Sequence, residues 1–441
     1  MKTLFRIIDG LIIAATACLC GGIILFPPLL FYIPLFIILF LLINIVPSPP
    51  DFSLKRARLR VCAEGADLLC SFLFASAIVL GLHITSAFYV KDYLPHFVIS
   101  CVVAFLVLSA VFWNGILRVY FTSVQLGLKY RIIGILCGLI PIANIIALIK
   151  IITVCLCEVE FENRKILLNQ SRKNDRICKT KYPILLVHGV FFRDSRFLNY
   201  WGRIPKELIT NGASVYYGDH QSALSVADSA QELYKRIKYI AEDTGCEKVN
   251  IIAHSKGGLD CRYAIAHLGA DKYIASLTTI NTPHKGCLFA DYLLKKVPEG
   301  AQNTIANAYN SALKNLGDDN PDFLSAVRDL TAESCKHLNE TTPDSEAVFY
   351  QSVGSRLNRA SSGKFPLNFT YHIAKHFDGE NDGLVSEKSF PWGEKFTYLK
   401  AKGRRGISHG DMVDLNRENI KGFDVREFYV QLVNELRQKG F

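Results

Sequence analysis

The stretch IIAHSKGGLDCRY, residues 251–263, joins an apolar, strand-like run directly to a helix-like run. Ser255 lies where the strand should end and the helix should begin. A sharp turn there would project the serine hydroxyl from the edge of a sheet and leave backbone N–H groups at a helix N-terminus, where negative charge is stabilised. Ala253 and Gly257 are small enough for such a turn. Taken alone, the stretch fits a nucleophile or a helix N-cap serine equally well.

Strand-like and helix-like runs alternate through residues 182–441. The strand-like runs are YPILLVHG (182–189), SVYYGD (214–219), EKVNIIAHS (247–255), IASLTTINTP (274–283), AVFYQSVGS (347–355) and EKFTYLKAK (394–402). The helical patterns are 225–243, about 257–268, about 287–297 and a closing amphipathic segment at 424–440. This alternation predicts an α/β fold with a mostly parallel sheet and helices on both faces. Functional groups of such folds collect at the carboxyl ends of the strands.

The segment HGVFF, residues 188–192, follows the first strand-like run. A His-Gly turn at this place would aim the N–H of Val190 into the crevice that holds Ser255. That N–H and the N–H of Lys256, the residue after the serine, are the two expected donors of an oxyanion hole.

Two later turns supply the remaining groups that a serine nucleophile needs, a base and a carboxylate that orients the base. ENDGLVS (380–386) places Asp382 in a polar turn, and GRRGISHGDMVDL (403–415) places His409 in a glycine-flanked loop. The chain order Ser, Asp, His is that of α/β-hydrolases. We therefore interpret Ser255 as a nucleophile.

Six blocks of the chain, in this order, resemble the bacterial triacylglycerol lipase family. They are YPILLVHG, AHSKGGLDCRY, NTPHKG, DLT, NDGLVS and SHGDMVD, and they extend over roughly residues 182–415. The resemblance implies an α/β-hydrolase fold and hydrolysis of carboxylic esters. By motif match it implies that Ser255 is the nucleophile, Asp382 the acid and His409 the base, with the N–H groups of Val190 and Lys256 as oxyanion donors.

The chain departs from the family pattern at two places. The family usually has Gln at the position of Lys256, so a cation stands near the expected oxyanion. The family's calcium site uses an aspartate two residues after the base, which matches Asp411, but its second aspartate has no match between Asp344 and Asp378. We therefore expect no required cofactor, with Asp411 as a candidate calcium ligand.

Other residues compete for these roles. Asp378 is the alternative to Asp382 as the acid. The histidines His188, His254 and His284 are expected to pack or to order loops, and Cys261 to lie in the core.

Residues 1–157 predict an all-α membrane region of about four to six spans. The apolar runs are 4–26, 29–46, about 62–84, 96–113 and 131–157, and the last is interrupted by Pro141. A helix needs about 20 apolar residues to cross a bilayer. Glu64 and Asp67 near the start of the third span would mark a transport pathway if they were functional, but interfacial placement is the interpretation we favour.

Short-loop Lys and Arg residues predict the orientation of the spans. They gather in the 51–60 loop and in 114–131, which favours a cytoplasmic N-terminus. The fifth apolar run would place the following domain outside as a single crossing, or return it to the cytoplasm as a bent pair around Pro141. The segment 158–181 has seven basic and four acidic residues, and the 13 cysteines show no CxxC motif. Both features favour a cytoplasmic catalytic domain.

We accordingly divide the chain into a membrane region (1–157), a basic linker (158–181) and a hydrolase domain (182–441) with a lid-like insertion at about 291–345. The predicted protein is a multi-pass enzyme of the cell membrane that cleaves lipid esters. A net charge of +10 without any dense Lys/Arg run interleaved with aromatics argues against a nucleic-acid partner. The alternatives are an acyltransferase or thioesterase with the same triad, a non-catalytic membrane scaffold, and a transporter with a soluble appendage.

Overall fold

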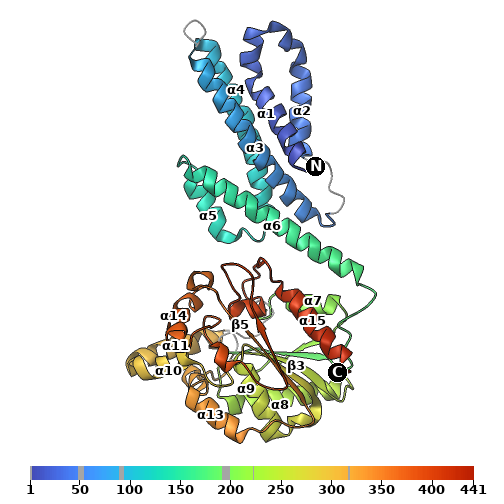
Figure 1. The fold of residues 1–441 in the computed structure, drawn as a ribbon, viewed down its shortest axis with the longest axis vertical. Coiled ribbons are helices and arrows are strands. Elements are labelled where there is room, and N and C mark those ends of the chain that lie inside the picture. The colour runs from blue at the N-terminus through green and yellow to red at the C-terminus, as the bar shows by residue number, and fades with distance from the viewer. Residues whose placement is uncertain (1, 48–53, 89–93, 191–198, 222, 316–317) are drawn as a thin grey trace. The chain divides into compact units, whose positions relative to one another are not determined.

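The computed structural model describes the chain except for residues 1, 48–53, 89–93, 191–198, 222 and 316–317 (Figure 1). The described residues form two compact units, Met1–Ser171 and Arg172–Phe441. The first 14 residues of the predicted linker are helical, because the last helix of the first unit, α6 (Ala143–Ser171), continues through them.

The second unit contains the predicted hydrolase domain and is called the catalytic unit after that prediction. It is built on one sheet in which every described strand pairs in parallel. The strands are β1 (Ile184–Val187), β2 (Val215–Tyr217), β3 (Val249–His254), β4 (Ile274–Ile280), β5 (Phe349–Ser355) and β6 (Lys395–Leu399), in the order β2-β1-β3-β4-β5-β6. All six lie within the runs that the sequence predicts. β1, β3 and β4 are buried on both faces, which is typical of central strands in a parallel sheet.

Helices cover both faces of this sheet, as the alternating pattern predicts. The helices α8 (Val226–Asp243) and α9 (Lys256–Leu268) pack on the face that carries Leu185 and Ile251. The helices α7 (Ile204–Thr210) and α15 (Val425–Gln438) pack on the opposite face, against Leu186 and Ile252. The chain winds outward in both directions from the β1–β3 pair, so a crevice is expected outside the carboxyl ends of these two strands.

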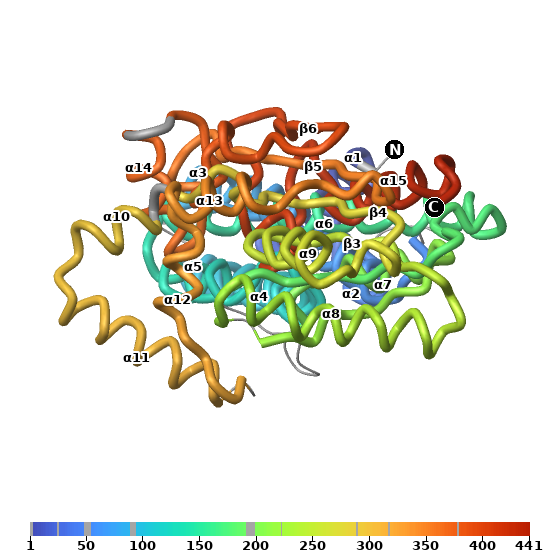
Figure 2. The backbone as a smooth tube through the Cα atoms, turned by 90° about the horizontal axis from the view of Figure 1, so that it is seen from below, coloured from blue at the N-terminus to red at the C-terminus, as the bar shows by residue number. Residues whose placement is uncertain are grey.

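A helical insertion separates β4 from β5. It contains α10 (Leu288–Lys296), α11 (Glu299–Asn315), α12 (Phe323–Arg328) and α13 (Ala332–Thr341). Figure 2 shows α10 and α11 projecting away from the central sheet. The insertion packs on Val385 and Phe390, a few residues beyond Asp382, so it lies beside one of the predicted catalytic loops.

The first unit is entirely helical in its described residues. Its helices are α1 (Lys2–Leu25), the short η1 (Pro27–Tyr32), α2 (Ile33–Ile45), α3 (Ala57–Ala87), α4 (Leu94–Thr122), α5 (Gly127–Cys137) and α6. Four stretches are long and apolar enough to cross a membrane: Thr3–Ile23, Pro27–Ile45, Ala57–Ala87 and Leu94–Thr122. The fifth apolar run of the sequence is divided between α5 and α6, which separate at the turn that contains Pro141.

Ion pairs join the helices of this unit. Arg118 Nη1 lies 2.6 Å from Glu64 Oε2, and Arg6 Nη2 lies 2.6 Å from Asp67 Oδ1. Both carboxylates that suggested a transport pathway therefore have basic partners on neighbouring helices. This arrangement favours a structural role, because a paired charge between helices costs much less than an isolated one.

Candidate active site

Ser255 lies at the turn between β3 and α9 with φ 55° and ψ −131°. A positive φ is uncommon for a residue with a side chain, and it marks backbone strain that the surrounding structure must hold in place. The Ser255 N–H donates to the carbonyl of Ile280 on β4 at 2.9 Å, and the Thr282 hydroxyl donates to the Ser255 carbonyl at 2.8 Å. The stretch is thus a strained elbow, and the serine side chain makes no helix-cap hydrogen bond.

The small residues of the elbow are required by close backbone packing. A Cβ added to Gly257 would lie 2.4 Å from the carbonyl oxygen of His188, and one added to Gly258 would lie 2.3 Å from Thr282 Oγ1. Ala253 is fully buried. The loop after β1 and the loop after β4 therefore pack closely against the elbow, and they leave no room for side chains at these glycines.

The structure brings Asp382 and His409 together. His409 Nδ1 lies 2.7 Å from Asp382 Oδ2, and the His409 N–H donates to the Asp382 carbonyl at 2.9 Å. Because an ionised carboxylate only accepts hydrogen bonds, the proton of the neutral imidazole is on Nδ1 and Nε2 is free to accept one. Asp382 is completely buried.

Three further donors hold the Asp382 carboxylate. The N–H groups of Leu384 and Val385 donate to Oδ1 at 2.9 and 2.8 Å, and the Asn281 side-chain amide donates to Oδ2 at 2.6 Å. Asn281 follows β4 directly, with φ 48°, and it also donates to Ser355 Oγ at 2.8 Å. The sequence analysis did not identify Asn281, although its position at a strand end was a signal.

The Ser255 hydroxyl makes no hydrogen bond within the described part of the chain, so the bond from Ser255 Oγ to His409 is not formed in this structure. Catalytic hydrogen bonds are often long before substrate binds. The ring of His254, the residue before the serine, packs against the His409 ring, with the two centroids 4.5 Å apart.

His254 is held by a tyrosine outside the elbow. The Tyr200 hydroxyl lies 2.6 Å from His254 Nδ1 and accepts the Gly189 N–H at 3.2 Å. Burial and the nearby His409 lower the pKa of His254 well below its usual range. The ring is therefore neutral and adds no second positive charge beside His409.

The two predicted oxyanion donors lie next to the elbow. Val190 is buried, and a Cβ on the preceding Gly189 would lie 2.7 Å from the Ser255 Cβ. The N–H of Lys256 opens helix α9, where backbone N–H groups have no partner within the helix. Their role as oxyanion donors remains a prediction, and Phe191 and Phe192 of the same segment lie outside the described residues.

The Lys256 side chain points away from solvent into a buried polar cluster. Its ammonium group donates to Asp260 Oδ1 at 2.6 Å and to Ser229 Oγ at 2.9 Å. Burial raises the pKa of Asp260 to about 7, although Lys256 lowers it. The cation that replaces the family's glutamine is thus neutralised within its own helix and tied to α8.

Asp411, the candidate calcium ligand, has protein partners for both carboxylate oxygens. Arg405 Nη2 donates to Oδ1 at 3.0 Å, and the Ser408 N–H donates to Oδ2 at 2.9 Å. Among the described residues, no group of three or more His, Cys, Asp or Glu side chains could hold a metal ion.

The competing histidines, His188, His254 and His284, and Cys261 are buried. The ring of His188 is stacked on His220 at 4.0 Å. The side chain of Asp378, the alternative acid, lies outside the described residues.

Comparisons with known proteins identify lipases that are similar to part of this chain. A triacylglycerol lipase 2 of Saccharomyces cerevisiae is 30% identical over 266 residues, which cover 55% of this chain and 75% of the relative. A triacylglycerol lipase of Pseudarthrobacter phenanthrenivorans is 34% identical over 181 residues, which cover 38% of this chain and 56% of the relative. The chain spans about half the length of the first curated relatives that it matches.

Among solved structures, the mature form of a Bacillus licheniformis lipase is 23% identical, with a TM-score of 0.44 over 58% of this chain and 92% of that chain. No protein-family model matches the chain.

Proposed function

The chain belongs to the triacylglycerol lipase family, and from this premise we propose that it is a membrane-anchored serine hydrolase of lipid carboxylic esters. The observation that supports the proposal most strongly is the convergence of three strand-end loops. They bring a strained serine elbow, a buried carboxylate and a histidine with its Nδ1 proton committed to that carboxylate to one edge of the sheet.

The proposed reaction begins with proton transfer. His409 Nε2 takes the hydroxyl proton of Ser255 as the oxygen attacks the ester carbonyl, and Asp382 stabilises the imidazolium that results. The N–H groups of Val190 and Lys256 stabilise the oxyanion of the tetrahedral intermediate. His409 then protonates the leaving alcohol, which departs and leaves an acyl-serine.

Water completes the cycle. His409, again neutral, accepts a proton from the attacking water, and the second tetrahedral intermediate collapses to a carboxylic acid and free Ser255. Burial of Asp382 under four donated hydrogen bonds keeps the carboxylate in one orientation throughout. The imidazole therefore needs no reorganisation at either step.

The helical insertion of residues 291–345 is proposed as a lid over the acyl pocket. Its helices pack on Val385 and Phe390 beside the Asp382 loop, and the rings of Tyr292 and Tyr309 are partly exposed. An insertion that can move relative to the sheet is a common means of admitting a lipid and excluding water.

Substitution of the nucleophile tests the proposal. In the detergent-solubilised full chain, Ser255→Ala should reduce the hydrolysis of short nitrophenyl esters to the uncatalysed level with an unchanged circular dichroism spectrum. His409→Ala should behave in the same way. Full activity in Ser255→Ala would contradict the assignment, and a folded wild-type protein with no esterase activity would favour the scaffold alternative.

We further propose that the chain leaves the membrane on the side on which it began. Four spans return the chain to that side. The helix α5 has 11 residues, about 16 Å at 1.5 Å per residue, and cannot cross a hydrocarbon core of about 30 Å.

The contacts of Glu158 support a hairpin that returns to the same level. The Glu158 carboxylate accepts hydrogen bonds from Ser123 Oγ at 2.6 Å and from the N–H groups of Val124 and Gln125 at 3.1 and 3.0 Å, and it pairs with Arg58 at 2.6 Å. The residues that precede α5 and the residue that ends the apolar part of α6 are thus in contact, as expected for a re-entrant pair of helices.

The distribution of basic residues favours the cytoplasm for this side of the membrane. Lys55 and Arg56 lie between the second and third spans, and Arg58 and Arg60 lie in the first turn of the third. On the other side, Lys91 is the only Lys or Arg among residues 26–32 and 88–94 of the sequence. A membrane-impermeant fluorophosphonate should label Ser255 in permeabilised cells and not in intact cells. Labelling in intact cells would contradict this topology.

A further inference from the structure

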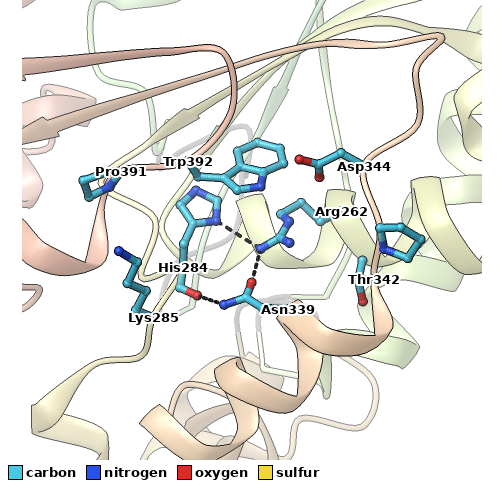
Figure 3. Close-up of a pocket in the computed structure, with 9 residues that line it drawn as sticks. Arg262, His284, Lys285, Asn339, Thr342, Asp344, Pro391 and Trp392 are labelled. Carbon is cyan, nitrogen blue, oxygen red and sulfur yellow. Dashed lines mark hydrogen bonds between the residues drawn. The ribbon is translucent and has the colours of Figure 1, made fainter.

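A cavity of about 300 Å3 lies in the catalytic unit, and Ser255 is not among its lining residues (Figure 3). Its lining residues come from α9, α13, the loop after β4 and the segments that precede β5 and β6: Arg262, His284, Lys285, Asn339, Thr342, Pro343, Asp344, Pro391 and Trp392. Ser255, Asp382 and His409 do not line it. The cavity is therefore not part of the proposed ester-cleaving site.

Arg262 is the central group of this cavity. Only 4% of the residue is exposed. Its Nη1 donates to Asn339 Oδ1 at 2.7 Å and contacts His284 Nδ1 at 3.4 Å, and its guanidinium carbon lies 4.7 Å from the centroid of the Trp392 ring. Its Nε has no hydrogen-bond partner. The guanidinium is thus held by hydrogen bonds at Nη1 and stacked on the Trp392 ring, and its Nε–H still lacks an acceptor.

The neighbouring histidine, His284, is neutral and contacts Arg262 only as a hydrogen-bond acceptor. Burial, Arg262 and Lys285 together lower the pKa of His284 well below its usual range. Because Arg262 only donates, His284 Nδ1 is the acceptor, and the Nε2 proton points to Thr279 Oγ1 at 2.9 Å. The Asn339 amide donates to the His284 carbonyl at 2.7 Å and fixes this arrangement.

The cavity has an excess of positive charge. Asp344 is the only carboxylate in its lining. It interacts electrostatically with Arg262, but among the described residues it forms no close ion pair with the guanidinium. Lys285 adds a second cation. Figure 3 shows the Arg262 guanidinium between His284, Asn339 and Asp344. Burying a cation without a close ion pair is costly. A fixed arginine whose only counter-charge is a carboxylate outside ion-pair distance, beside an open cavity, therefore fits an anion site.

We propose that this cavity binds a small carboxylate through the free edge of the Arg262 guanidinium, with Lys285 as a second positive contact. A carboxylate is planar and has two acceptor oxygens, which match two parallel N–H donors of arginine. The side chains of Pro343, Pro391 and Trp392 offer an apolar wall to a short aliphatic tail. The site is independent of the proposed esterase activity, because it shares no residue with the triad.

Calorimetric titration of the full chain in a non-ionic detergent tests the proposal. At constant ionic strength, butyrate should bind with saturation at one site per chain, and more tightly than acetate or inorganic phosphate. Arg262→Gln should weaken butyrate binding at least about tenfold, because a hydrogen bond to a charged group is lost. The matched control Arg437→Gln removes an exposed arginine of α15 and should leave binding unchanged.

Two gentler variants keep the test decisive if Arg262→Gln does not fold. Lys285→Gln should weaken butyrate binding, and Asp344→Asn should strengthen it, because the competing negative charge is removed. A purely structural cluster would give neither effect. Absence of saturable butyrate binding, tighter binding of phosphate than of butyrate, or unchanged affinity in Asp344→Asn would each overturn the proposal.

Discussion

Replacement of Lys256 by methionine probes the buried pair at the base of the nucleophile elbow. Lys256→Met keeps a long apolar stem but removes the ammonium group that donates to Asp260 at 2.6 Å and to Ser229 at 2.9 Å. Both members of the ion pair are almost fully buried. Where Asp260 is ionised, removing its partner costs about 3–5 kcal/mol of unfolding free energy, since the carboxylate is left buried without compensation.

The pH dependence of this cost follows from Asp260. Its folded-state pKa is raised to about 7 by burial, so the folded protein keeps a proton that the unfolded chain releases near pH 4. The stability that this proton provides is complete below pH 4 and is lost as the pH rises to about 7. Lys256 lowers this pKa, so in Lys256→Met the loss continues above pH 7. The difference between variant and wild type should then grow by about 1.4 kcal/mol per pH unit.

Urea unfolding of the detergent-solubilised chain at pH 6, 7, 8 and 9 measures this difference. Trp201 and Trp392 report on the catalytic unit, and Trp113 of the membrane unit is replaced by Phe in every variant. The control is the double variant Lys256→Met/Asp260→Asn, which removes the buried acid and should recover stability with no dependence on pH above 7. A destabilisation by Lys256→Met that is constant from pH 7 to pH 9 would refute the reasoning.

Two further variants test the elbow and the acid. Asn281→Ala removes the 2.6 Å donor to Asp382 and should lower kcat for nitrophenyl esters about ten- to hundredfold with KM unchanged. The reason is that hydrogen bonds to charged groups contribute about 1.5–3 kcal/mol. An unchanged kcat would contradict the role of Asn281 in holding the acid. Gly257→Ala places a Cβ 2.4 Å from the His188 carbonyl oxygen. It should abolish fluorophosphonate labelling, measured on a gel, or folding, measured by circular dichroism. A fully active variant would contradict the close packing of the elbow against the loop after β1.

The strands were the most predictable part of the fold. Each of β1, β3 and β4 is a short apolar run that is buried on both faces, and such runs stand out between turn residues. The helices α7 and α14 (Leu367–Asp378) were not anticipated. Their patterns are short or broken by polar residues, and tertiary packing rather than local periodicity selects the helix.

The site was predictable where a residue type and a strand end coincide. Asp382 and His409 lie in polar, glycine-flanked turns, and the structure brings them to 2.7 Å. The contacts of Asn281 and Tyr200 were not predictable, because they depend on which strands become neighbours in the sheet. The contact between Lys256 and Asp260 was predictable from the sequence, since residues four apart share a face of a helix. Nothing in the sequence indicated that this pair is buried.

In the membrane region, too, some features were predictable from the sequence and others were not. The four long apolar helices follow from composition alone. The fifth apolar run was ambiguous, and Pro141 marked the place where α5 and α6 separate. The contact between Glu158 and residues 123–125 was not predictable, because it depends on how the two helices fold back on each other.

Identification of the residue that a fluorophosphonate modifies tests the central claim most directly. The full chain in detergent is treated with the probe, digested and analysed by mass spectrometry, with Ser255→Ala and the heat-denatured wild type as controls. We predict a single modified serine, Ser255, in the peptide that contains AHSKGGLDCR, and no labelling in either control. Modification of another serine with Ser255 unlabelled, or labelling that persists in Ser255→Ala, would contradict the assignment of the nucleophile.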